Sequence, residues 1–119
     1  MNHYLHLDKM KHLSALQVQD LIEKKDTSAP NSFYLLDVRT KGEFARRRIK
    51  TAVNIPLDEL VHRTGEIPKE KMIVTICEHG FRSQTAAGIL QRVGFEDVFN
   101  MMGGMSQWRG MAISDEVRS

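Results

Sequence analysis

Apolar residues recur at helical spacing near the start of the chain. Ser14 and Gln17 have the S-x-x-Q spacing of a capping box, in which two side chains bond backbone N–H groups at a helix N-terminus. We therefore expect a first helix over about residues 14–25. Its buried face would consist of Ala15, Val18, Leu21 and Ile22.

Short apolar runs alternate with further helical patterns along the rest of the chain. The run from Met72 to Ile76 is apolar and β-branched, which is typical of a central strand covered on both faces. Strands that alternate with helices predict an α/β fold with a mostly parallel central sheet, flanked by helices on both faces. The expected strands lie near residues 33–38, 52–55, 72–76 and 97–101. The expected helices lie near residues 42–48, 57–61 and 83–93, with a helical turn after residue 104.

Length and composition indicate one soluble globular domain. The 119 residues, 41% of them hydrophobic, predict a single domain over residues 1–119. Seventeen Lys and Arg against 15 Asp and Glu leave a net charge of +2, which is too small to indicate nucleic acid as a partner. No apolar run is long enough to predict a membrane span. The N-terminal segment MNHYLHLDKMKH lacks the apolar core of a secretory signal, which favours a cytoplasmic location.

Cys77 is the only cysteine, so the chain has no intrachain disulfide and no cysteine-rich zinc site. It follows the predicted central strand directly, and ligands of open α/β sheets bind at such strand ends. Gly80 lets the loop curl until its N–H groups point inward, while Arg82 and the following helix N-terminus add positive charge. These surroundings favour a thiolate at Cys77. The structural alternative is a small buried hydrophobe.

Four motifs carry a family resemblance. They are LLDVRTKGEF (35–44), AVNIP (52–56), CEHGFRS (77–83) and GGMSQW (103–108). In this order and spacing, the chain resembles the rhodanese domain over about residues 13–111. The resemblance implies the rhodanese α/β fold and an enzyme of the thiosulfate:cyanide sulfurtransferase class. Cys77 would take sulfane sulfur from a donor, hold it as a persulfide and pass it to a thiophilic acceptor.

The resemblance also implies the partners of this chemistry. The donor would be thiosulfate or a persulfide-bearing protein, and the acceptor would be a thiol or cyanide. Loop N–H groups would hold the sulfur, and Arg82 would help to neutralise the sulfonate of the donor. No metal or organic cofactor is required, and neither nucleic acid nor a membrane is expected as a partner. The expected substrate-binding residues are Glu78, His79, Gly80, Phe81 and Arg82.

Two other functions remain open. One is a persulfide carrier or docking module for protein partners, with little activity on thiosulfate. The other is a phosphatase or arsenate reductase of the same fold, in which the resemblance implies an arginine six positions after the cysteine. Here Arg82 is the fifth residue after Cys77, and this shorter loop encloses little more than a sulfur atom. Loop length therefore favours sulfur transfer.

The chain departs from the family pattern before residue 53. Many rhodanese domains have a Gly-His-Ile-x-Gly-Ala run there, whereas this chain reads RRIKTA (47–52), so the usual turn is not expected. The neighbouring basic run, Arg46, Arg47 and Arg48, is either a solvated helix C-terminus or a docking surface for an anionic partner.

Polar residues beside the predicted site have structural alternatives as well. Asp37 and Arg39 are expected to form structural ion pairs, with each other or with Glu43. His79 next to Cys77 suggests a catalytic base, but neighbours on a curled loop generally point apart, and an ionised thiol needs no base. We therefore expect His79 to face solvent.

Overall fold

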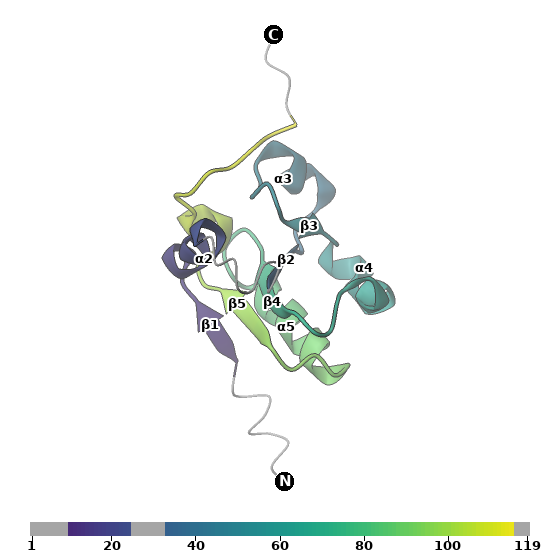
Figure 1. Ribbon diagram of the computed structural model, residues 1–119. Coiled ribbons are helices and arrows are strands. Elements are labelled where there is room, and N and C mark those ends of the chain that lie inside the picture. Colours follow the sequence, from purple (N-terminus) through teal and green to yellow (C-terminus); the bar gives the residue numbers. More distant parts are fainter. Residues whose placement is uncertain (1–9, 25–32, 116–119) are drawn as a thin grey trace.

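The computed structural model describes residues 10–24 and 33–115, in which five strands form one sheet. The strand order is β1-β5-β4-β2-β3, every strand pair is parallel, and β1 and β3 form opposite edges (Figure 1). The strands are β1 (Lys11–Leu13), β2 (Phe33–Asp37), β3 (Val53–Asn54), β4 (Met72–Ile76) and β5 (Val98–Met101). The helices are α2 (Ala15–Glu23), α3 (Lys41–Arg46), α4 (Leu57–Arg63) and α5 (Arg82–Arg92), with 3-10 turns η1 (Thr64–Glu66) and η2 (Gly104–Gln107).

Helices cover the sheet on both faces, which confirms the predicted fold class. One hydrophobic cluster joins α4 and α5 to the sheet through Leu60 and Leu90. A second cluster on the other face joins α2 and η2 to it through Val18, Met105 and Trp108. Because β4 lies in the middle of the sheet, its alternating side chains enter both clusters, as the run Met72–Ile76 predicts.

Capping residues define where the helices begin. Ser14 and Gln17 form the predicted capping box of α2, and Thr40 and Glu43 form a second one at α3. The second box begins α3 one residue before the predicted start at 42. Gly94, with φ 103°, follows the last turn of α5, where the left-handed conformation favours glycine.

Two pairings near the chain ends were not predicted. β1 has only three residues and pairs with β5, with Leu13 opposite Met101. Arg48 forms an antiparallel bridge with Ile113, through backbone hydrogen bonds of 2.9 and 2.8 Å. The turn in the run RRIKTA closes where Ala52 N–H donates to the Ile49 carbonyl at 3.0 Å, and Ile49 is buried. The departure from the family pattern therefore still forms a turn.

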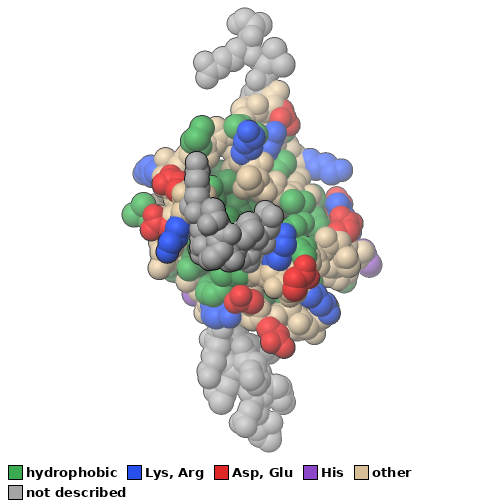
Figure 2. Space-filling model, viewed as in Figure 1, with side chains coloured by type: hydrophobic (Ala, Val, Ile, Leu, Met, Phe, Trp, Pro, Cys, Tyr) green, Lys and Arg blue, Asp and Glu red, His purple; other side chains and the backbone are tan. Residues whose placement is uncertain are grey.

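No helix in residues 10–24 or 33–115 is long and apolar enough to cross a membrane. On the face shown in Figure 2, acidic and basic side chains are interspersed rather than gathered by sign, in keeping with the small net charge. The N-terminal segment that favoured a cytoplasmic location lies outside the described residues, apart from its last three.

Candidate functional site

Cys77 lies directly after β4, at the carboxyl edge of the sheet. Its side chain is 1% exposed and joins the hydrophobic cluster under α4 and α5. Asp37, the last residue of β2, ends its strand next to Ile76 at the same edge. The structure therefore brings the cysteine and the polar end of β2 together, as expected for parallel strands.

The loop after Cys77 curls back onto the sulfur. The Gly80 N–H group donates a hydrogen bond to Cys77 Sγ at 3.0 Å. Gly80 has φ 94°, and a Cβ there would come within 2.9 Å of the Gly103 nitrogen. Only glycine fits this position, because both the positive φ and the close backbone approach exclude a side chain. Several N–H groups of the loop were predicted to point inward, and the N–H group of Gly80 is the one that contacts the sulfur among the described hydrogen bonds.

The turn η2 holds the other side of this loop. The Met105 N–H group donates to the Cys77 carbonyl at 2.8 Å, and the Ser106 N–H group donates to the Glu78 carbonyl at 2.9 Å. Gly104, with φ 60°, permits this approach, since a Cβ there would lie 2.6 Å from the Glu78 carbonyl oxygen. The GGMSQW motif therefore supports the cysteine loop from behind.

Arg82 forms a bidentate ion pair with Glu43 of α3. Its two terminal nitrogens lie 2.8 and 2.9 Å from the two carboxylate oxygens. The hydrogen bonds from Arg82 lower the pKa of Glu43 to about 2. The sequence did not predict this pair, which neutralises much of the charge that Arg82 was expected to offer to an anionic donor. Glu43 N–H and carboxylate also complete the capping box with Thr40.

Asp37 and Arg39 form the expected structural ion pair, and both are buried. Arg39 Nη2 lies 2.8 Å from Asp37 Oδ2, and its Nε also donates to the carboxylate. The same guanidinium reaches the cysteine loop, because Nη1 donates to Glu78 Oε1 at 3.2 Å. Arg39 thus links the end of β2 to Glu78, the residue directly after Cys77. An open, charged pocket is lined by Arg39 and Glu78 together with Glu43, Arg46 and Arg47.

The remaining loop side chains face outward. His79 is exposed, and Phe81 is 75% exposed. Phe81 therefore stands at the loop mouth rather than in the core. His79 faces solvent, as expected.

The basic run has three different environments. Arg47 donates to the carbonyls of Met105 and Trp108, both at 2.8 Å, and so braces η2. Arg48 pairs with Asp115 at 2.7 Å. Arg46 is exposed beside the charged pocket. The run is therefore neither a uniform solvated helix end nor a uniform docking surface.

Two residues near the sulfur were missed by the sequence analysis. Ser83 Oγ lies 3.2 Å from Cys77 Sγ, and the same hydroxyl bonds Asn100 Oδ1 from β5. Both residues are fully buried. The S of the motif CEHGFRS could have indicated Ser83, because it lies in the first turn of a helix that follows the cysteine loop. Nothing in the sequence places Asn100 there, since the contact joins residues 17 positions apart.

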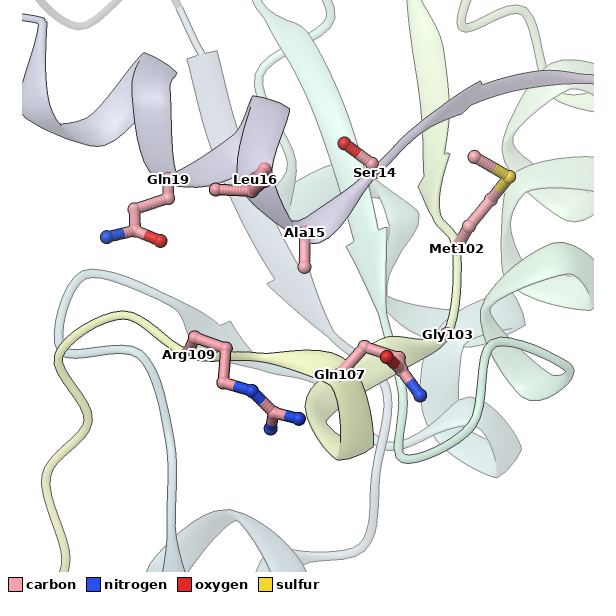
Figure 3. A pocket seen from close by; sticks show the side chains of 8 residues that line it. All are labelled: Ser14, Ala15, Leu16, Gln19, Met102, Gly103, Gln107 and Arg109. Carbon is pink, nitrogen blue, oxygen red and sulfur yellow. The ribbon is translucent and has the colours of Figure 1, made fainter.

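A separate hollow lies between the first turn of α2 and the segment 102–109 (Figure 3). Ala15 and Leu16 line it from the helix, while Met102, Gln107 and Arg109 line it from the segment. Cys77 is not among its lining residues.

Within the described ranges, no group of three or more His, Cys, Asp or Glu side chains is placed to hold a metal ion.

Comparison with known proteins adds family relatives. The rhodanese-like domain family matches residues 14–111. Thiosulfate sulfurtransferase GlpE of Shewanella oneidensis is 33% identical over 102 residues, which cover 86% of this chain and 95% of that protein. Adenylyltransferase and sulfurtransferase uba4 of Ogataea parapolymorpha is 35% identical over 96 residues, which cover 80% of this chain. This chain spans only 25% of that longer relative.

A solved structure shows the same fold. The solution structure of the rhodanese-like domain from the Anabaena sp. Alr3790 protein matches with a TM-score of 0.79. The match covers 91% of this chain and 83% of that one, at 24% sequence identity. At this identity the likeness extends to the fold alone.

Proposed function

Because the chain belongs to the rhodanese-like domain family, we propose that it is a sulfurtransferase that carries sulfane sulfur as a persulfide on Cys77. The observation that carries this proposal is the bond from Gly80 N–H to the Cys77 sulfur at the end of β4. A backbone donor aimed at sulfur stabilises its anionic form, which is the nucleophile. A cysteine that only filled the core would need no such donor.

The first half-reaction loads the sulfur. The Cys77 thiolate attacks the outer sulfur of thiosulfate, the S–S bond of thiosulfate breaks, and sulfite leaves with the bonding electron pair. A persulfide donor reacts in the same way and releases its own thiolate. The step exchanges one S–S bond for another, so it requires no external oxidant or reductant.

The second half-reaction returns the enzyme to its starting state. A thiol or cyanide acceptor attacks the outer sulfur of the persulfide, and the Cys77 thiolate leaves. The Gly80 N–H group faces the leaving sulfur and stabilises its charge. The exposure of His79 and Phe81 at the loop supports a role for these side chains in meeting donors and acceptors.

The arginines around the loop offer only part of their positive charge to a small anion, because they are paired with carboxylates. Arg82 shares its charge with Glu43, and Arg39 shares its charge with Asp37 and Glu78. Arg46, exposed beside the charged pocket, therefore offers the clearest attraction for thiosulfate. These contacts favour the Gly80 N–H group over arginine charge as the main stabiliser of the sulfur.

The test separates loading from discharge. The protein is incubated briefly with thiosulfate, desalted and weighed by intact mass spectrometry beside a Cys77→Ser variant. We expect one added sulfur atom on the wild type only. Cyanide should then remove this sulfur, and a colour assay should detect it as thiocyanate.

Other outcomes identify the alternatives. Loading from a persulfide-bearing protein but not from thiosulfate would favour the persulfide carrier. Failure with both donors would reject persulfide chemistry, and turnover of an aryl phosphate that depends on Cys77 would then support a phosphatase. A docking test on the basic run should change Arg46 alone, because Arg47 and Arg48 also hold the C-terminal segment.

A further inference from the structure

A line of hydrogen bonds leads from Cys77 to the edge of the sheet. Cys77 Sγ contacts Ser83 Oγ at 3.2 Å, Ser83 Oγ bonds Asn100 Oδ1, and Asn100 Nδ2 lies 3.1 Å from His12 Nδ1. Ser83 and Asn100 are fully buried, whereas His12 on β1 is exposed. The line, which we call the relay, therefore connects a buried sulfur with a titratable group in contact with solvent.

The sheet register holds the relay in place. His12 is the register partner of Asn100, and Asn100 is the register partner of Thr75 on β4. Paired positions on neighbouring strands point their side chains to the same face of a sheet. Thr75 Oγ1 also donates to the Ser83 carbonyl at 2.8 Å, which fixes the start of α5 over this row. The relay is thus part of the folded core rather than a chance surface contact.

Each hydrogen bond in the relay has a direction. In the structure, Asn100 Nδ2 faces His12 Nδ1. Because the amide NH2 group donates, His12 Nδ1 accepts this hydrogen bond and carries no proton. Asn100 Oδ1 then accepts the hydroxyl hydrogen of Ser83. Ser83 Oγ is left to accept a hydrogen bond from the Cys77 thiol. A neutral His12 with a bare Nδ1 therefore favours the protonated thiol.

Protonation of His12 reverses these directions. A protonated imidazole presents Nδ1–H, which needs an acceptor, so the amide of Asn100 turns its oxygen toward His12. Asn100 Nδ2 then donates to Ser83 Oγ, and the Ser83 hydroxyl donates to Cys77 Sγ. The sulfur now receives two donors, Ser83 and Gly80, which suit a thiolate.

We propose that His12 is a positioning residue that couples its own protonation to the ionisation of Cys77 through Asn100 and Ser83. His12 takes its proton from solvent, and the thiol gives its proton to solvent, so the relay transmits orientation and not a proton. The coupling keeps the nucleophile ionised at mildly acidic pH. It deepens the proposed function, because the Cys77 thiolate is the attacking group.

Other titratable groups surround the relay on neighbouring elements. These groups are Lys11 and its partner Asp97 at the β1–β5 edge, Asp20 and Glu23 on α2, and Glu43, Glu78, His79 and Arg82 around the cysteine loop.

The first experiment measures thiolate reactivity without sulfur transfer. Alkylation rates of Cys77 by iodoacetamide are recorded from pH 5 to 8 for the wild type and for His12→Gln. Glutamine keeps a hydrogen-bonding partner for Asn100 but does not ionise. We expect the ratio of the rate at pH 5.5 to the rate at pH 8 to fall about fivefold in the variant, the lower end of typical coupling between linked sites.

A matched variant controls for the loss of a histidine. His62→Gln removes an exposed histidine on α4, away from the cysteine loop. This variant should keep the wild-type ratio. An unchanged ratio in His12→Gln, or an equal fall in His62→Gln, would overturn the proposal.

A reciprocal experiment leaves His12 in place. Coupling between two sites acts equally in both directions, so removal of the thiol must change the titration of His12. The imidazole of His12 is titrated by NMR in the wild type and in Cys77→Ser, and we expect a lower midpoint in the variant. Identical midpoints would contradict the relay. If neither thiosulfate nor a persulfide-bearing protein loads the wild type while both experiments show coupling, the proposed function fails and the relay stands.

Discussion

Gly104 is the residue at which a single added carbon should do most harm to the cysteine loop. Its φ of 60° and its approach to the Glu78 carbonyl leave no room for Cβ. We predict that Gly104→Ala destabilises the protein by about 2–4 kcal/mol, through left-handed strain and displacement of the loop. Urea unfolding should show the loss of stability, and Cys77 alkylation in the folded variant should change its rate.

Gly88 on α5 provides the matched control. A Cβ there meets nothing within 4 Å, and the residue lies inside a helix. Gly88→Ala should therefore stabilise the protein by about 0.5–1 kcal/mol, because alanine has the higher helix propensity. Equal destabilisation by both variants would show that Gly104 has no special role.

At the scale of elements, the Glu43–Arg82 pair joins the first turn of α3 to the first residue of α5. A cation at a helix N-terminus is unfavourable, and the carboxylate of Glu43 offsets that charge. Because the pKa of Glu43 is about 2 in the folded protein against 4.5 ordinarily, the pair stabilises the fold fully above about pH 4.5. The stabilisation is lost as the pH falls toward 2.

We predict that Glu43→Gln lowers the free energy of unfolding at pH 7 by about 1–2 kcal/mol, a value reduced for the partial exposure of Arg82. Glutamine retains the capping box with Thr40, so the variant isolates the charge. Urea unfolding at pH 7 and pH 2.5 checks this, since the difference between the two proteins should be much smaller at the lower pH. Asp97→Asn, which removes an exposed pair with Lys11, should have little effect at either pH.

The strands show which elements can be predicted from local sequence patterns. β4 was predicted to the residue, because five apolar or β-branched residues between polar turns have one simple interpretation. β1 was missed, because Lys11, His12 and Leu13 are too few for a period and their pairing depends on a strand at the other end of the chain. Long-range partners of this kind are not encoded in local spacing.

The candidate site divides in the same way. Gly80 was predicted to let the loop curl, since glycine in a short strand-to-helix loop has a local conformational meaning. The partner of Arg82 was not predicted, because it comes from another helix. The relay was missed for the same reason, as it joins side chains from β1, β5 and α5.

For the molecule as a whole, Arg47 links the region of α3 to the C-terminal segment. Its guanidinium donates to two carbonyls, of Met105 and Trp108, and its own carbonyl accepts from Arg39. We predict that Arg47→Ala destabilises the protein by about 1–2 kcal/mol, because two charge-assisted hydrogen bonds are lost. Thermal unfolding should show a lower Tm.

The neighbouring Arg46→Ala removes the same charge from an exposed position. It should change stability by no more than about 0.5 kcal/mol. If the two variants have equal stability, the hydrogen bonds from Arg47 to Met105 and Trp108 contribute nothing measurable to stability.

The pairing of β1 with β5 also has a consequence for synthesis on the ribosome. β1 is the first of the described strands to be translated, but its partner ends at Met101. The edge of the sheet therefore stays open until nearly all of the described chain has left the exit tunnel. His12 can reach Asn100 only after β5 has emerged, so the proposed relay cannot form before that point of synthesis.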